Sequence, residues 1–300
     1  MVTPRLVCVV GSGFLGTQIG VTCARHGYTV NLYDISEEAL ASSSEAVDNY
    51  VDEWVDDGDI TVEEGQAVMR RISYVDGLEE AASNAEVVIE AVVERLDVKR
   101  EVFRRLDEVC RGDAFIATNS SSIKVSRIED ATRNPRRVLN MHFYGYPWRR
   151  RVVELMRGSS TSDEVMEKAK GFCRSIGLYP LMVLRESTGF IFNRVWRAVK
   201  KECLMVVDQG VASFEDVDRA WMSLYGTEAG PFGMMDRVGL DVVRDIEMVY
   251  YLESGDPMDA PPGILLRKIE RGELGVKTGK GFYRYPGPSY MEPGWLYGDE

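Results

Sequence analysis

Short apolar runs alternate with amphipathic stretches over the first 184 residues of the chain. The runs are rich in Val, Ile and Leu, which is typical of buried strands; they lie at 6–10, 29–33, 72–75, 87–93, 114–118, 138–143, 152–156 and 179–184. The stretches between them repeat apolar residues at intervals of three and four, which predicts helices at 14–26, 36–56, 61–71, 78–83, 97–111, 126–132 and 162–176. Strands that alternate with helices indicate an α/β fold of the Rossmann type, with a doubly wound sheet.

The pattern changes near residue 185, beyond which helical spacing prevails and strand-like runs nearly disappear. We predict helices at 190–208, 231–238 and 241–252, and a further helix that Ser213 caps. The tail from Pro286 is rich in Pro, Gly and Tyr, which predicts irregular structure. We therefore expect two domains, a Rossmann domain at 1–186 and a smaller all-α domain at 187–300.

A G-x-G-x-x-G pattern follows the first predicted strand. It consists of Gly11, Gly13 and Gly16, with Phe14 and Leu15 between the last two. Such glycines permit a tight turn and a close approach of the backbone to a pyrophosphate, and the following helix start offers free N–H groups. The second strand ends in Asp34, which is placed to bind the ribose hydroxyls and to repel a 2′-phosphate. The pattern predicts an NAD site; the alternative is an ordinary βαβ turn that binds no dinucleotide.

Composition narrows the class of protein. The net charge of −12 disfavours nucleic acid and anionic membranes as partners, and no stretch approaches the ~20 apolar residues of a membrane span. The five cysteines are scattered and show no metal-ligand spacing, so we expect no metal site and a reducing, cytoplasmic setting. Residues 36–70 hold eleven acidic side chains and one basic one, which is typical of a solvated helical hairpin.

One of the two histidines, His142, ends an apolar run, and Glu154 follows twelve positions later inside a second apolar run. If the two runs pair as a hairpin around residues 144–151, the two side chains lie opposite each other. A carboxylate at that distance fixes the imidazole tautomer and favours its protonated form. Beside an NAD site, such a pair predicts proton and hydride transfer at one carbon, whereas a histidine without that setting is more often a satisfied core residue.

With these segments placed, the chain resembles the L-3-hydroxyacyl-CoA dehydrogenase family over nearly its whole length. The resemblance rests on the glycine pattern and on five further stretches in the same order: 88–94, 118–122, 141–143 with 153–155, 189–194 and 275–282. It implies NAD-linked interconversion of a 3-hydroxyacyl-CoA and a 3-oxoacyl-CoA, within fatty acid metabolism. We expect the helical domain to close over a small-molecule substrate and, because it is rich in apolar residues, to support a homodimer; the alternative is that these residues only fill its own core.

The resemblance extends to single residues. His142 and Glu154 match the family's catalytic histidine and its carboxylate partner, Ser121 matches a serine that binds the reacting oxygen, and Asn193 matches an asparagine contributed by the helical domain. Glu94, Lys99 and Lys277 match positions at or near the cofactor. The residues alone leave structural alternatives open: a loop cap for Ser121, a helix cap for Asn193, and a surface ion pair for Glu94 and Lys99.

The chain departs from the family after its histidine. The family usually continues Phe-Phe-Asn-Pro, whereas this chain continues Phe143, Tyr144 and Gly145 and then carries three arginines at 149–151. The acidic segment 36–70 replaces lysines that help the family to bind the CoA phosphates. Two alternatives therefore stay open: a dehydrogenase of a free hydroxy acid held by these arginines, and a non-catalytic NAD-binding relative. The arginines could also form no more than a solvated loop.

Overall fold

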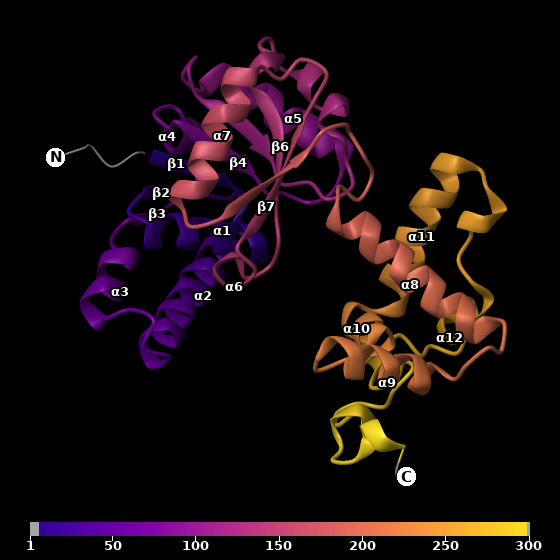
Figure 1. The fold of residues 1–300 in the computed structure, drawn as a ribbon. Coiled ribbons are helices and arrows are strands. Elements are labelled where there is room, and N and C mark those ends of the chain that lie inside the picture. The colour runs from indigo at the N-terminus through magenta and orange to yellow at the C-terminus, as the bar shows by residue number, and fades with distance from the viewer. Residues whose placement is uncertain (1–5, 299–300) are drawn as a thin grey trace. The chain divides into compact units, whose positions relative to one another are not determined.

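The computed structural model describes residues 6–298, which form two compact units that meet in the sequence between Ile191 and Phe192. The first unit is built on one eight-stranded sheet in the order β3-β2-β1-β4-β5-β6-β7-β8 (Figure 1). Its strands are β1 (Leu6–Val10), β2 (Thr29–Tyr33), β3 (Ile72–Val75), β4 (Val87–Glu90), β5 (Phe115–Thr118), β6 (Val138–Phe143), β7 (Val152–Arg157) and β8 (Tyr179–Val183). Strands β1 to β6 are parallel to one another. The strand direction reverses only between β6 and β7, which pair as an antiparallel hairpin, and β8 is parallel to β7.

Helices cover both faces of this sheet, which explains why its central strands are apolar along their whole length. One face packs in a core with α1 (Phe14–Arg25), α2 (Glu37–Asp56), α3 (Val62–Met69) and α7 (Asp163–Ser175). The other face packs with α4 (Leu78–Ala82) and α5 (Leu96–Val109). The strand order reverses beside β1, so the loops after β1 and β4 diverge at the carboxyl edge of the sheet, where doubly wound folds bind their ligands. The predicted α/β, Rossmann-type fold is confirmed.

The helix starts in this unit follow their capping signals. Ser36 accepts the backbone N–H of Ala39, and Thr61 and Glu64 form a reciprocal capping box at the start of α3. Two predicted boundaries were wrong. The helix expected at 126–132 is a pair of 3-10 turns, Val125–Arg127 and Glu129–Ala131, and in the first of them the Ser126 N–H donates to the Glu186 carboxylate at 2.9 Å. The strand expected at 87–93 ends at residue 90, because the N–H of Val92 donates to the Glu90 carboxylate instead of to a neighbouring strand.

The second unit is helical. It contains α8 (Phe192–Asp208), α9 (Phe214–Tyr225), α10 (Pro231–Val238), α11 (Leu240–Ser254) and α12 (Gly263–Glu270) around an aromatic-rich core. The sequence pattern missed α12, which is only eight residues long and follows two prolines. The tail from Pro286 is irregular as expected, yet it is packed, since Tyr290 and Trp295 are buried in the unit's core. Within residues 6–298, no helix is both long and apolar enough to cross a membrane.

Candidate active site

The glycine turn between β1 and α1 has no room for side chains at two of its three glycines. Gly11 has φ +103°, and a Cβ there would lie 2.7 Å from the carbonyl oxygen of Ala91. A Cβ on Gly16 would lie 1.9 Å from the Gly11 oxygen, so this glycine lets the helix pack against the turn. By contrast, a Cβ on Gly13 would meet nothing within 4 Å. No side chain caps α1, so its first N–H groups face this open space, as an anionic pyrophosphate requires.

A cavity of about 710 Å³ adjoins the glycine turn. Its lining comes from the turn, the end of β2, the loop after β4 and the start of α5, and includes Gly11, Gly13, Asp34, Val92 and Arg105. The Asp34 carboxylate also holds the turn itself, because its Oδ2 accepts from the Ser12 backbone N–H at 2.9 Å and from the Ser12 hydroxyl at 3.2 Å. The residues present therefore fit NAD: an anion site at the helix start, an adjoining cavity and an acid at its edge.

The side chains of Phe14 and Leu15 have different environments within the turn. Phe14 is 61% exposed and packs edge-on against Tyr146 with ring centroids 5.8 Å apart. Leu15 is partly buried and packs against the sheet's core. Leu15 therefore anchors α1, and Phe14 remains on the surface of the turn.

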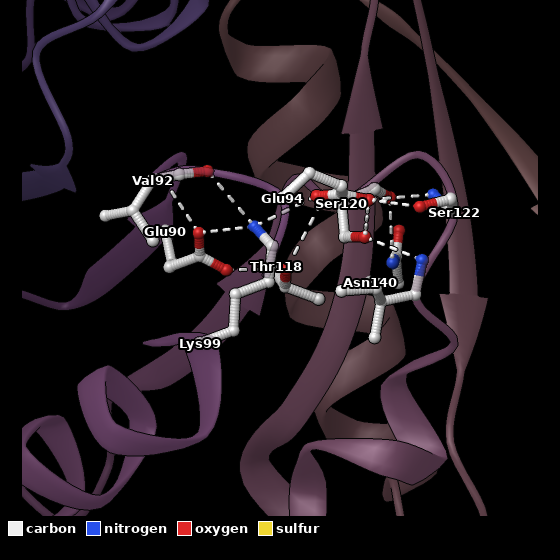
Figure 2. A network of polar contacts seen from close by, with 9 residues as sticks. Glu90, Val92, Glu94, Lys99, Thr118, Ser120, Ser122 and Asn140 are labelled. Carbon is white, nitrogen blue, oxygen red and sulfur yellow. Dashed lines mark hydrogen bonds and ion pairs between the residues drawn. The ribbon is translucent and has the colours of Figure 1, made fainter. Parts of the chain in front are cut away.

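A buried ion pair lies behind the ends of β4 and β5 (Figure 2). The Lys99 Nζ lies 2.7 Å from Glu90 Oε1 and 3.3 Å from Glu94 Oε2, and its side chain is only 1% exposed. The second Glu90 oxygen accepts the Thr118 hydroxyl at 2.7 Å. Such a pair is costly to break once buried, so this network fixes the two strand ends relative to α5. Lys99 is thus no surface residue, and the surface-pair alternative is wrong.

Glu94 connects this network to the loop after β5. Its Oε1 accepts the hydroxyl and backbone N–H of Ser122, at 2.7 and 3.0 Å, and the hydroxyl of Ser120. Burial alone would raise the pKa of Glu94, but the Ser120 hydrogen bond and the Lys99 charge hold this pKa below its usual value. Figure 2 shows the two serines converging on this carboxylate. Ser121 lies between them and is exposed, so the loop is fixed on either side of it.

The β6–β7 hairpin forms in the predicted register, with His142 directly opposite Glu154. The His142 Nδ1 lies 3.0 Å from Glu154 Oε2, and the two side chains are 6% and 0% exposed. Glu154 Oε1 accepts the backbone N–H of Ile191 at 2.9 Å. Phe190, held at φ +54°, stacks on the imidazole with centroids 4.7 Å apart and an interplanar angle of 20°. The imidazole is thereby held by a carboxylate at one nitrogen and by an aromatic ring on one face.

Two further polar residues at this hairpin were missed by the sequence analysis. The Tyr144 hydroxyl donates to Glu154 Oε2 at 2.7 Å. The side chain of Asn119 accepts the backbone N–H of Phe143 at 2.8 Å. This bond fixes the end of β6 to the loop after β5, residues 119–122. The alternation of the strand could have indicated Tyr144, since it lies two residues after His142 and hence on the same face. Nothing local to Asn119 indicated its contact.

Two family models match this chain, one in its N-terminal part and one in its C-terminal part. Residues 6–187 match the family model of the 3-hydroxyacyl-CoA dehydrogenase NAD binding domain, and residues 189–285 match that of the C-terminal domain. The chain belongs to the 3-hydroxyacyl-CoA dehydrogenase family.

Individual members of this family match the chain over nearly its whole length. The chain is 32% identical over 281 residues to a probable 3-hydroxybutyryl-CoA dehydrogenase of Bacillus subtilis, covering 94% of this chain and 97% of the relative. It is 31% identical over 291 residues to the mitochondrial hydroxyacyl-coenzyme A dehydrogenase of Homo sapiens, covering 93% and 90%. The crystal structure of (S)-3-hydroxybutyryl-CoA dehydrogenase from Ralstonia eutropha superposes with a TM-score of 0.90 at 30% identity, covering 95% of this chain and 100% of that one. The chain is accordingly an NAD-dependent oxidoreductase that acts on a CH–OH group.

The segment that departs from the family pattern packs tightly against α1 and α2. It contains the short helix α6 (Pro147–Arg150) between two residues in the left-handed region, Tyr146 and Arg151. The Tyr146 N–H donates to the side chain of Gln18 at 2.7 Å, and Arg149 forms an ion pair with Glu53 of α2. Arg151 lies over the Tyr179 ring, 5.5 Å from its centroid. Arg149 and Arg151 thus both have partners within the protein, and the partner of Arg149, Glu53, belongs to the acidic segment.

The remaining predicted site residues belong to the second unit. Asn193 lies in the first turn of α8 and is partly buried. Lys277 lies in a 3-10 turn, Val276–Thr278, and its Nζ is 2.5 Å from Asp241. In the first unit the glycine turn, Asp34, the loop after β5 and His142 all lie at the carboxyl ends of parallel strands. The contributions of Asn193 and Lys277 to that site stay predictions.

Proposed function

We propose that this protein interconverts a 3-hydroxyacyl-CoA and a 3-oxoacyl-CoA, with His142 and Glu154 as its acid–base pair. The observation that carries the proposal is the buried hydrogen bond between His142 Nδ1 and Glu154 Oε2. It leaves Nε2 as the nitrogen that exchanges a proton with substrate. Several relatives in the family are named for hydroxybutyryl-CoA or hydroxyacyl-coenzyme A, which favours a thioester substrate.

In the oxidation, the hydroxyl proton must leave as the hydride leaves the same carbon. His142 Nε2 accepts that proton, and acid–base help of this kind is worth ~10²–10⁴-fold in rate. Glu154 stabilises the imidazolium that forms, because its charge lies 3.0 Å from the other ring nitrogen. Bound NAD supplies the hydride acceptor. The pair returns the proton to the substrate oxygen in the reverse direction.

The substrate oxygen carries partial negative charge during the reaction and requires donors. Ser121 is the donor that we assign from the first unit, because Glu94 fixes its loop through Ser120 and Ser122. Asn193 is the donor that we assign from the helical unit. For NAD we assign the glycine turn and Asp34 as direct contacts, and Glu94 and Lys277 as polar contacts. We assign Lys99 an indirect role: its buried ammonium pairs with the Glu90 and Glu94 carboxylates and so holds Glu94 in place.

The arginine segment 149–151 offers a free hydroxy acid fewer cations than its sequence suggests. Arg149 is paired with Glu53, and Arg151 donates to the carbonyl oxygen of Gly177 and lies over Tyr179, which leaves Arg150 as the cation on which the free-acid alternative depends. The Arg149–Glu53 ion pair also neutralises one charge of the acidic segment, which would otherwise repel a CoA phosphate. A homodimer formed through the helical unit, and a cytoplasmic setting, remain predictions. Sedimentation at micromolar concentration tests the dimer, and a monomer there would refute it.

The test is a turnover assay that follows NADH absorbance with matched substrates. We expect activity on (S)-3-hydroxybutyryl-CoA and none on 3-hydroxybutyrate, and the opposite result would discard the thioester. The His142→Gln variant should lose at least about 10²-fold in kcat/KM. The matched control is His26→Gln, because the only other histidine bonds to the Thr22 carbonyl at the end of α1 and should leave turnover nearly unchanged. A fully active His142→Gln protein would refute the assigned base.

A further inference from the structure

Three side chains share one face of the β6–β7 hairpin. His142 lies in β6 and Tyr144 directly follows that strand; both side chains contact Glu154, while Phe143 between them is buried in the core. Glu154 is the direct register partner of His142 and joins them on that face. Leu181 pairs with Glu154 on its other side and is apolar. The hairpin thereby places the Tyr144 phenol against the Glu154 carboxylate, which is also hydrogen-bonded to the His142 imidazole.

Both donors use the same carboxylate oxygen. The His142 Nδ1 lies 3.0 Å and the Tyr144 hydroxyl 2.7 Å from Glu154 Oε2, whereas the Ile191 N–H bonds to Oε1. The Tyr144 ring also meets the imidazole edge-on, with centroids 4.7 Å apart and an interplanar angle of 67°. The phenol therefore contacts both members of the acid–base pair.

We propose that Tyr144 is a positioning residue that sets how strongly Glu154 favours a proton on His142. The proposal rests on the assignment of His142 and Glu154 as the acid–base pair. A hydrogen bond from a neutral donor stabilises the charge on a carboxylate, so the carboxylate gains less from a neighbouring cation. The Tyr144 hydroxyl thus weakens the pull of Glu154 on the imidazolium and lets His142 release its proton at lower pH. Its ring limits rotation of the imidazole at the same time.

The charges around the phenol keep it a donor. Burial, the hydrogen bond to Glu154 and the Glu154 charge all raise the pKa of Tyr144 above its usual range, and the nearby Arg150 cation only partly opposes them. Tyr144 therefore stays protonated at any pH at which the protein works. The charges of the first unit that act on the phenol include those of Glu154 on β7 and Arg150 on α6, and His142 lies on the same carboxylate.

The decisive variant is Tyr144→Phe, which removes one oxygen and keeps the ring against the imidazole. We expect the acidic limb of its kcat/KM–pH profile for oxidation to move to higher pH by about half a unit or more, because Glu154 then holds the imidazolium more tightly. The control is Tyr179→Phe on β8, which removes a hydroxyl from a 60% exposed residue of the same sheet. Its profile should match that of the unchanged protein.

A second measurement does not depend on turnover. The chain has only two histidines, so ¹⁵N-histidine NMR yields two pairs of ring signals, and His26 serves as an internal reference. In Tyr144→Phe the titration midpoint of His142 should rise while that of His26 stays fixed. If both the pH profile and the His142 titration are unchanged in a folded Tyr144→Phe protein, the proposal is overturned. If His142→Gln instead keeps full activity, the assigned base is wrong, and the NMR titration still decides whether Tyr144 acts on His142.

Discussion

Each unit of the molecule contains completely buried carboxylates, and two of these, Glu154 and Asp218, are held in similar ways. Glu154 on β7 bonds to the Ile191 N–H, the Tyr144 hydroxyl and the His142 ring. Asp218 on α9 bonds to two backbone N–H groups at the start of α10, those of Phe232 and Gly233, and to the hydroxyl of Tyr283. Both residues are 0% exposed.

The difference between the two carboxylates is the imidazole. Asp218 meets donors that keep their protons, so it can only fix α10 and the C-terminal turn in place. Glu154 meets an imidazole, which can take up and release a proton, so its charge can be used in a reaction. A buried acid in an apolar run therefore indicates a function only when a titratable partner accompanies it. The two sites can be separated experimentally.

The largest expected effect comes from Glu154→Gln. The amide keeps an oxygen for either the Tyr144 or the Ile191 donor, which bond to different oxygens of Glu154, and offers no charge to the imidazolium, so kcat/KM should fall by ~10²–10⁴-fold. Steady-state kinetics with urea unfolding as a parallel measurement tests this. A variant that loses its fold together with its activity would place Glu154 in the same class as Asp218.

Asp218→Asn should have the opposite outcome. An amide at this position turns an N–H toward at least one of three donors, which costs about 1–3 kcal/mol of unfolding free energy. Hydrogen exchange by mass spectrometry should show faster exchange over α10, since its first amides lose their acceptor. We expect kcat/KM to change only a few-fold. A loss as large as that of Glu154→Gln would show that the comparison between the two acids is mistaken.

The pH dependence of stability sharpens the same contrast. Burial, reinforced by the Asp236 charge, raises the pKa of Asp218 from 3.8 to about 6 despite its hydrogen bonds. The folded state thus binds this proton more tightly than the unfolded state, so the resulting stability is present below pH 3.8 and is lost as the pH rises through about 6. The difference in unfolding free energy between the unchanged protein and Asp218→Asn should grow by about 2 kcal/mol between pH 7 and pH 4. A difference that is constant with pH would contradict this account.

The smallest effect should come from Tyr283→Phe, the counterpart of Tyr144→Phe. It removes a hydrogen bond of 2.9 Å to Asp218 and should cost about 1 kcal/mol of unfolding free energy. Because no imidazole shares that carboxylate among the contacts of residues 6–298, the kcat/KM–pH profile should not move. Urea unfolding and a pH profile measured on one preparation test both parts, and a displaced profile would count against the distinction.

The sequence was most informative where local rules act. The period of apolar residues predicted the strand–helix alternation, and the capping residues Ser36 and Thr61 marked two helix starts. The twelve-residue spacing of His142 and Glu154 predicted their contact, because a hairpin register follows from the alternation of two adjacent strands. The glycine pattern predicted the turn at Gly11 and Gly16, where a side chain cannot fit.

Tertiary structure decided what depends on residues far apart in the chain. Nothing in the sequence indicated that Asn119 would fix the end of β6, that Glu53 would pair with Arg149, or that Phe190 would stack on His142. The surroundings of Lys99 also became evident only once β4, β5 and α5 were assembled, since a lysine at a helix start is ordinarily exposed. Periodicity and capping act over a few residues and can be read along the chain, whereas burial and partner choice depend on which elements the fold brings into contact.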